Sequence, residues 1–286
     1  MPASLNFRAT VISVLLLLAF LGVWQVATMT SATVAATAPM TAEQLEYLKM
    51  LGKDPGAQKA GGFPTPLQMG QTVWKHVSDP FYDRGPNDKG IAIQLGHSLT
   101  RVGAGFLLAC IVAIPLGFVI GMSPLLHRAL DPFIQILKPI SPLAWMPLAL
   151  YTIKDSSASG IFVIFICSVW PMLINTAFGV ASVKREWLNV AKTLEVQPLR
   201  KAFQVILPAA APTILTGMRI SMGIAWLVIV AAEMLVGGTG IGYFVWNEWN
   251  NLSLTNVMFA IGVIGVMGML LDLAFAQLQK WVTYAE

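Results

Sequence analysis

The sequence predicts an all-α integral membrane protein, a polytopic bundle of about six transmembrane helices. Hydrophobic residues make up 56% of the chain and charged residues only 11%, and the mean hydropathy is +0.69. Ordinary soluble domains do not have this balance. Several apolar runs approach the roughly 20 residues that a helix needs to cross a bilayer. These runs show no strict alternation of apolar and polar residues, which argues against a membrane β-barrel.

The first apolar run covers residues 11–26, after Arg8, and a tract of small residues then leads to Pro39. A charged start, an apolar run and an Ala-rich tract are also typical of a cleaved secretory signal. Pro39 directly follows Ala38, where cleavage would be expected, and it should impede that cleavage. We therefore favour a retained transmembrane helix over residues 1–28.

Residues 29–95 form a long polar segment, predicted to be periplasmic and to contain short helices. It is electrically neutral, with six Lys/Arg and six Asp/Glu, and so poses no barrier to translocation. Thr41 and Gln44 have the spacing of a capping box at the start of one helix. Thr65 caps a second helix that begins at Pro66. The segment is either an ordinary extracytoplasmic loop or a docking surface.

The second predicted span covers residues 97–122 and has a face of small residues. They recur every four positions, at Gly105, Ala109, Ala113, Gly117 and Gly121. In lipid, such a face lets two helix backbones approach closely. This span should therefore be a packing helix within the bundle.

The third predicted span, residues 132–153, follows a short turn and is irregular. Proline stands at positions 139, 142 and 147, which forbids a regular helix. Broken backbone at membrane depth is tolerated only against protein or water, so this span is the best candidate for a pathway lining. Lys138 either lines that pathway or extends to the cytoplasmic surface. The pathway candidates in this span are Lys138, Pro142, Trp145 and Met146.

Three further spans are predicted at residues 161–180, 212–235 and 254–278. Asn175 lies inside the fourth, where an interhelical hydrogen bond is its usual role. The fifth places Arg219 near one end and Glu233 near the other. These three residues complete the list of pathway candidates. The Gly- and Trp-rich residues between the last two spans are expected to form an interfacial loop.

Residues 184–208 form a basic, amphipathic segment between the fourth and fifth spans. Five Lys/Arg against two Glu predict a cytoplasmic location, and both termini then lie in the cytoplasm as well. Two short apolar stripes follow helical spacing: Trp187, Ala191 and Leu194, then Leu199, Phe203 and Ile206. The segment is either a connector in the membrane interface or a helix presented to a groove on a partner.

Residues that could carry chemistry are sparse. The chain lacks the GxxxxGK[ST] phosphate loop, and its three histidines and two cysteines are scattered. Cys110 and Cys167 lie in apolar runs, which is typical of packing residues. We therefore expect no catalytic residues, no metal site, no enzymatic activity and no nucleic-acid binding.

The stretch NVAKTLEVQPLRKAFQVILP, residues 189–208, resembles the coupling motif of bacterial ABC importer permeases. That motif reads EAA, three residues, Gly, nine residues, Ile, one residue, Leu-Pro. Asn189 replaces the motif's Glu and Glu195 replaces its Gly. The resemblance assigns contact with an ATPase to Glu186, Asn189, Val190, Ala191, Lys192, Thr193, Leu194, Glu195, Val196, Leu207 and Pro208.

Other segments resemble the branch of these permeases for nitrate, sulfonate, taurine and bicarbonate, and the nitrate permeases most. They are HSLTRVGAGFLLA, IPLGFVIGMSP, LDPFIQILKPISPLAWMPL, GMRISMGIAWLVIVAAEML and GTGIGY. The resemblance implies a type I ABC importer permease core over residues 96–286, with a coupling loop at 182–211. Arg219 falls on a Gly-Leu-Arg pattern of the family, which implies a general gate or packing role for it.

The resemblance also implies a function. The chain would be the multi-pass inner-membrane pathway subunit of an ATP-driven importer for a small anion, most closely nitrate or nitrite. Its implied partners are a second permease copy in a homodimer, ABC ATPase subunits that carry the ATP and Mg, a periplasmic substrate-binding protein and membrane lipid. The chain itself would hold no cofactor. Bicarbonate, a sulfonate or taurine are alternative cargoes, and a non-transporting membrane scaffold is an alternative function.

Overall fold

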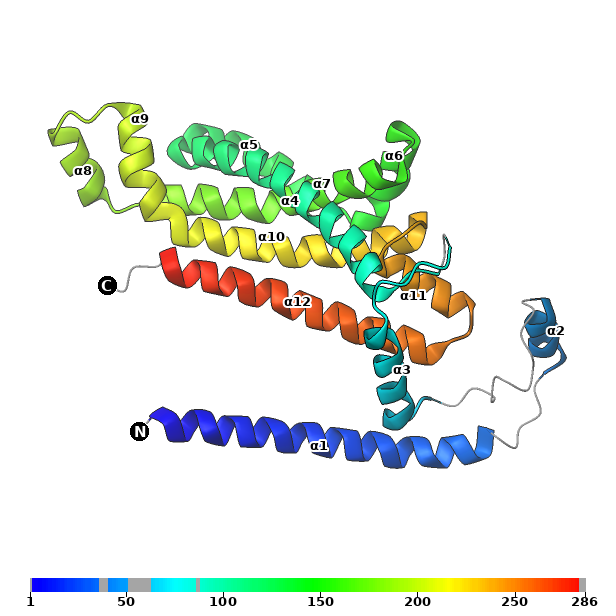
Figure 1. Ribbon diagram of the computed structural model, residues 1–286. Coiled ribbons are helices and arrows are strands. Elements are labelled where there is room, and N and C mark those ends of the chain that lie inside the picture. The colour runs from blue at the N-terminus through cyan, green and yellow to red at the C-terminus, as the bar shows by residue number, and fades with distance from the viewer. Residues whose placement is uncertain (1, 36–40, 51–62, 86–87, 283–286) are drawn as a thin grey trace. The chain divides into compact units, whose positions relative to one another are not determined.

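The computed structural model describes residues 2–35, 41–50, 63–85 and 88–282, and these residues are almost entirely helical (Figure 1). Among them, five helices are long and apolar enough to cross a membrane, or six when one bent pair counts as a span. The described residues contain no β-strand beyond a single bridge between Asp83 and Lys89. The predicted all-α membrane class is confirmed. The chain divides into two units, residues 1–78 with 251–259, and residues 79–250 with 260–286.

The first unit contains the N-terminal helices. They are α1 (Pro2–Ala35), α2 (Ala42–Met50) and α3 (Pro66–Ser78), joined by the first residues of α12 (Leu254–Val282). The start of α3 is the predicted one: the Gln68 N–H donates to Thr65 Oγ1 at 3.3 Å, and the Thr65 N–H donates to Gln68 Oε1 at 3.0 Å. This is a complete capping box. Helix α2 begins just after Thr41, while the side chain of Gln44 lies outside the described residues.

The core of the second unit is made of three long helices that lie side by side in Figure 1: α4 (Ile91–Met122), α7 (Ser156–Ala181) and α10 (Leu207–Val236). The small residues of α4 face α7, as the sequence predicts. A Cβ added to Gly105 would collide with Ile164, and one added to Gly117 would collide with Thr176. The absence of side chains is therefore what lets the two backbones approach.

Replacing Gly117 with valine tests this packing. A Cβ there would lie 2.8 Å from both the Leu173 carbonyl oxygen and the Thr176 Cβ, and backbone atoms of α7 cannot easily yield. We expect Gly117→Val to lower the free energy of unfolding by about 3 kcal/mol, measured by thermal unfolding in detergent. Gly103→Val, on the same helix with no atom within 4 Å, is the control and should change little. Equal effects of the two variants would contradict the packing role.

The third predicted span is a bent pair of helices, α5 (Pro124–Leu137) and α6 (Pro142–Ile153), which meet at 90°. The predicted break is confirmed. The prediction of a turn before residue 132 was wrong, because Ser123 accepts the Leu126 N–H and Pro124 takes the first helical position. Ser141 caps α6 in the same way.

The segment between α7 and α10 contains α8 (Arg185–Thr193), α9 (Pro198–Lys201) and a five-residue π-helix, η1 (Ala202–Ile206). From Pro198 the helix runs without a break into α10, so the predicted start of the fifth span at residue 212 was wrong. A proline lacks an N–H and crowds the carbonyl four residues before it. The wider π-turn stands immediately before Pro208, where it gives that carbonyl room.

The Gly- and Trp-rich residues after α10 were predicted as a loop, yet they form α11 (Ile241–Asn250). Helix α12 then runs beside α10, linked by three side-chain interactions within the second unit. Trp226 Nε1 donates to the Ile264 carbonyl, Gln279 donates to Thr216, and Arg219 pairs with Asp272. The last helix is therefore held to the bundle along much of its length.

Candidate functional site

Helix α8 lies at one end of the second unit (Figure 1), and it carries an exposed apolar stripe. Trp187, Val190 and Leu194 are 45%, 59% and 71% exposed, at spacing i, i+3, i+7. Ala191, one turn after Trp187, is only 4% exposed. The stripe predicted from the sequence therefore had one wrong member, because Ala191 faces the core and Val190 takes its place. Two large apolar side chains on a nine-residue helix, with a third at its C-cap, make an exposed apolar surface typical of a contact site.

The turn after α8 has the geometry of a Schellman motif. The Val196 N–H donates to the Ala191 carbonyl and the Glu195 N–H to the Lys192 carbonyl, both at 3.0 Å. Glu195 has φ of 51°, in the left-handed region. Glycine is the usual residue at this position because it has no Cβ. Glu195 therefore makes the same tight turn that the glycine of the coupling motif makes, with strain in its backbone.

Replacing Glu195 with glycine should relieve that strain. A residue with a side chain costs about 1–2 kcal/mol in the left-handed region. Glycine removes this cost, but it also raises the conformational entropy of the unfolded chain, which cancels part of the gain. We expect Glu195→Gly to raise the free energy of unfolding by about 1 kcal/mol, measured by thermal unfolding in detergent. Glu195→Ala removes the same carboxylate but keeps the Cβ, so it should give no gain. A gain of the same size in both variants would show that the side chain, not the backbone, is responsible.

A second exposed apolar pair follows the turn. Leu199 on α9 and Phe203 on η1 point outward, whereas Ile206 is buried. Ile206 belongs to a core cluster with Val180, Val183, Ala210 and Ile214, against which Leu188 of α8 packs. This cluster connects α8 directly to the ends of α7 and α10. A displacement of α8 would therefore act on both long helices.

The residues predicted to contact an ATPase are mostly at the surface. Ala191 is buried, and Val196 and Leu207 are half-buried. The exposed ones are Glu186, Asn189, Val190, Lys192, Thr193, Leu194, Glu195 and Pro208.

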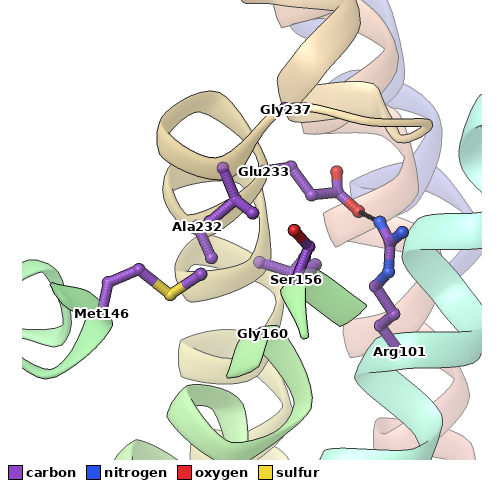
Figure 2. A pocket seen from close by; sticks show the side chains of 9 residues that line it. Arg101, Met146, Ser156, Gly160, Ala232, Glu233 and Gly237 are labelled. Carbon is purple, nitrogen blue, oxygen red and sulfur yellow. Dashed lines mark hydrogen bonds and ion pairs between the residues drawn. The ribbon is translucent and has the colours of Figure 1, made fainter. Parts of the chain in front are cut away.

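At the other end of α7 and α10, a small pocket contains the buried ion pair of Arg101 and Glu233 (Figure 2). Arg101 Nη1 lies 2.8 Å from Glu233 Oε1, and the Glu233 side chain is 3% exposed. The same carboxylate accepts the Ser98 hydroxyl and the Gly242 N–H at 3.0 Å. Met146 of α6 lines the pocket from another side. Two predicted pathway residues, Met146 and Glu233, are thus brought together.

The polar face of α4 also holds the start of α11. Gln94 Oε1 accepts the Gly240 N–H at 2.6 Å, and Ser98 Oγ accepts the Ile241 N–H at 2.9 Å. The first N–H groups of a helix have no partner within that helix. Side chains of α4 and α10 supply these partners, which explains why a helix, α11, begins directly after the Gly-rich residues. Arg101 Nη1 adds a bond to the Thr239 carbonyl at 2.7 Å, and its Nε donates to Ser157.

Other predicted pathway residues lie elsewhere. Lys138 caps α5 and lines a groove of about 440 Å³ between α4, α5 and α7, together with His127, Asp131 and Gln135. Pro142 and Trp145 are half-buried at the start of α6.

Asn175 and Arg219 are engaged within the bundle. Asn175 Nδ2 donates to the Pro171 carbonyl one turn earlier on its own helix. This bond lies within one helix, whereas an interhelical bond was expected. Arg219 makes two bonds, of 2.5 and 2.6 Å, to the Asp272 carboxylate. It is the thirteenth residue of the 30-residue α10. Its predicted place near an end was wrong, because α10 begins at Leu207 and not at Pro212.

Sequence reasoning missed Arg101 and its neighbours. Gln94, Ser98 and Arg101 recur at i, i+4, i+7 in an apolar helix, and this polar stripe was the signal available. Glu233, the carboxylate that Ser98 and Arg101 share, lies more than 130 residues later in the chain, so the sequence alone does not pair them.

Known proteins share both the sequence and the fold. Residues 113–284 match the family described as binding-protein-dependent transport system inner membrane component. A nitrate import permease protein NrtB of Synechocystis sp. is 42% identical over 228 residues, which cover 80% of this chain and 83% of the relative. A bicarbonate transport system permease protein CmpB of the same organism is 45% identical over 204 residues, covering 71% and 73%. A taurine transport system permease protein TauC of Escherichia coli is 32% identical over 215 residues, covering 75% and 72%.

Among solved structures, the MetNI methionine ABC transporter in inward-facing conformations superposes with a TM-score of 0.61 at 13% identity. The match covers 68% of this chain and 96% of that chain. This likeness confirms the predicted type I ABC importer permease fold. By both the family match and the identity to its relatives, the chain belongs to the binding-protein-dependent transport system inner membrane components and is a multi-pass permease subunit of an ABC importer.

Proposed function

We propose that this permease forms the pathway of an importer for nitrate or nitrite, driven by ATPase subunits that bind residues 184–208. The observation that carries the proposal is the outward stripe of Trp187, Val190 and Leu194 on a short helix at the end of the bundle. An amphipathic helix of this kind fits an apolar groove on a partner protein. The chain lacks a phosphate loop, so ATP and Mg belong to those partners.

The transmission step follows from the packing of α8. Leu188 of α8 contacts the core cluster that joins the ends of α7 and α10. When the ATPases close, α8 moves with them, and α7 and α10 follow as rigid bodies because packed interfaces switch between discrete arrangements. The Arg101–Glu233 pocket lies roughly 40 Å away along α10, at 1.5 Å per residue. Rotation of α10 would therefore change its spacing from Met146 of α6 on one side and from α4 on the other.

The proposed topology places residues 184–208 and both termini in the cytoplasm. Residues 29–95 and α11 then lie on the periplasmic side, where a substrate-binding protein delivers the anion. A second copy of the permease completes the pathway. Residues 1–28 act as the N-terminal span and residues 96–286 as the permease core. The excess of Lys/Arg in residues 184–208 supports this orientation.

Lys138 is the proposed attraction for the anion at the cytoplasmic half of the pathway. Lys138 is exposed and lines a groove. The other titratable side chains of that groove are Asp131 and His127. Lys138→Gln should lower nitrate uptake several-fold when nitrate is limiting, because a charged cleft raises the local concentration of an anion. Lys154→Gln, which removes an exposed lysine after α6, is the control and should leave uptake unchanged. Equal uptake by wild type and Lys138→Gln at limiting nitrate would remove Lys138 from the pathway.

The choice of nitrate is supported by relatives that are named nitrate permeases and are 40–45% identical to this chain. Bicarbonate is the second candidate, because relatives named bicarbonate permeases are 44–45% identical. The two anions are planar, singly charged and similar in size. A permease pathway needs only a modest positive potential and hydrogen-bond donors for either of them.

Reconstitution tests the proposal. The permease, its ATPase subunits and its binding protein are placed in liposomes, and the uptake of nitrate, nitrite, bicarbonate and taurine is measured with and without ATP. We expect ATP-dependent uptake of nitrate and nitrite. Uptake of bicarbonate or taurine in their place would reassign the substrate. If ATP drove the uptake of none of the four solutes, a membrane scaffold would be favoured. Substrate-stimulated ATP hydrolysis in the same vesicles separates transporter from scaffold independently.

A further inference from the structure

Helix α3 has its two ends held against two apolar membrane helices. Near its start, Trp24 Nε1 of α1 donates to the Pro64 carbonyl at 3.0 Å, and the Trp24 ring meets the Phe63 ring edge-on at 6.1 Å. Near its end, the buried His76 ring stacks on Phe259 of α12 at 4.7 Å. All of these contacts lie within the first unit.

The positions of these contacts place α3 at the edge of the membrane. The apolar span of α1 covers Phe7–Thr28, so Trp24 lies one turn from its end. Helix α12 begins at Leu254, so Phe259 lies within its second turn. A 13-residue helix is about 20 Å long, and both of its ends are tied to span ends. Such a helix lies along the membrane–water boundary, not across it.

The sequence of α3 divides its surface into three faces at 100° per residue. His76 and the half-buried Met69 face the packed side. Gln68, Gln71, Lys75 and Ser78 form a polar face. Between these two lies an exposed apolar face, with Leu67 at 70% and Trp74 at 75% exposed, together with Val73 and Val77.

We infer that this apolar face is a lipid-binding surface, inserted among the headgroups and upper acyl chains of the leaflet at the C-terminal end of α1. A helix in the interface plane buries its apolar face and keeps its polar face in water. Tryptophan is enriched at this depth, since its ring is apolar and its N–H is polar. Lys75 stands on the polar face, where its ammonium group reaches the headgroups. Helix α3 thereby bridges the first and last spans at the membrane surface.

The inference is tested by spin labels on the full chain, assembled with its partner subunits in lipid nanodiscs. Cysteines replace Leu67, Trp74, Gln71 and Lys75 one at a time, in a background where Cys110 and Cys167 are alanine. All four sites are exposed, so the labels should not disturb the fold. The accessibility of each label to dioxygen, which concentrates in lipid, is compared with its accessibility to Ni(II)-EDDA, which stays in water.

We expect labels at Leu67→Cys and Trp74→Cys to be several-fold more accessible to dioxygen than to Ni(II)-EDDA. The order should reverse at Gln71→Cys and Lys75→Cys on the polar face. High accessibility of the label at position 74 to Ni(II)-EDDA would overturn the inference, because the face would then lie in water. Shielding of that label from both reagents would also overturn it, because protein would then cover the face.

Discussion

Replacing Val190 with aspartate should reduce ATP-driven uptake by roughly 30-fold or more, because a charge buried without a partner at a contact costs at least about 2 kcal/mol. Val190 lies at the centre of the exposed stripe on α8, between Trp187 and Leu194. Its side chain points away from the bundle, so the variant should fold like the wild type. Basal ATP hydrolysis by the ATPase subunits should persist, while its stimulation by substrate should be lost.

Gln197→Asp provides the matched control for this prediction. Gln197 is exposed between α8 and α9, outside the stripe, and aspartate is well suited to the start of a helix. The variant carries the same added charge, and it should retain uptake. Two variants that lose uptake equally would show that any negative charge in residues 184–208 is harmful, and the stripe would then have no special role.

Replacing Glu233 with alanine is expected to destabilise the second unit by about 3–5 kcal/mol, since it leaves a buried cation unpaired. Arg101 has a 16% exposed side chain and would lose its carboxylate partner, while Ser98 and the Gly242 N–H would each lose an acceptor. Thermal unfolding in detergent measures the loss. Limited proteolysis between α10 and α12 should also become faster, because α11 would lose part of its anchorage.

Glu233→Gln is the informative companion. The amide oxygen can still accept from Arg101, but the amide NH2 cannot accept the Gly242 N–H, so the effect should be smaller than that of alanine without vanishing. If both variants were as stable as the wild type, the network of α4, α10 and α11 would not hold this end of the bundle. A loss of uptake in Glu233→Gln with unchanged stability would point to a role in the pathway.

Much of the fold can be predicted because its causes are local or periodic. The small residues of α4 recur every fourth position, and they do face α7, where a Cβ at Gly117 would meet backbone. Prolines around residue 140 break the third span as expected. By contrast, the start of α11 depends on hydrogen bonds that its N–H groups donate to Gln94 and Ser98, about 145 residues earlier in the chain. A local sequence pattern does not predict partners so far away.

The candidate site shows the same division. Amphipathic spacing predicts that residues 184–208 contain two short helices with apolar stripes. Which member of each stripe faces out depends on where α7 and α10 lie, so Ala191 and Ile206 turned out to be buried. The polar residues inside the spans were all visible in the sequence. Their pairing, Arg101 with Glu233 and Arg219 with Asp272, follows only from the packing of helices distant in the chain.

We propose that the stripe on α8 is the contact through which ATPase subunits move this permease. Cross-linking tests it most directly. Val190→Cys and Leu194→Cys are made in a background without Cys110 and Cys167. The complete transporter is then treated with a short cross-linker that has one thiol-reactive and one amine-reactive end. We expect both variants to yield a permease–ATPase product whose amount changes when ATP binds, whereas Gly103→Cys on α4 should yield none. The absence of that product from both α8 variants, in a complex that still imports its anion, would contradict the account.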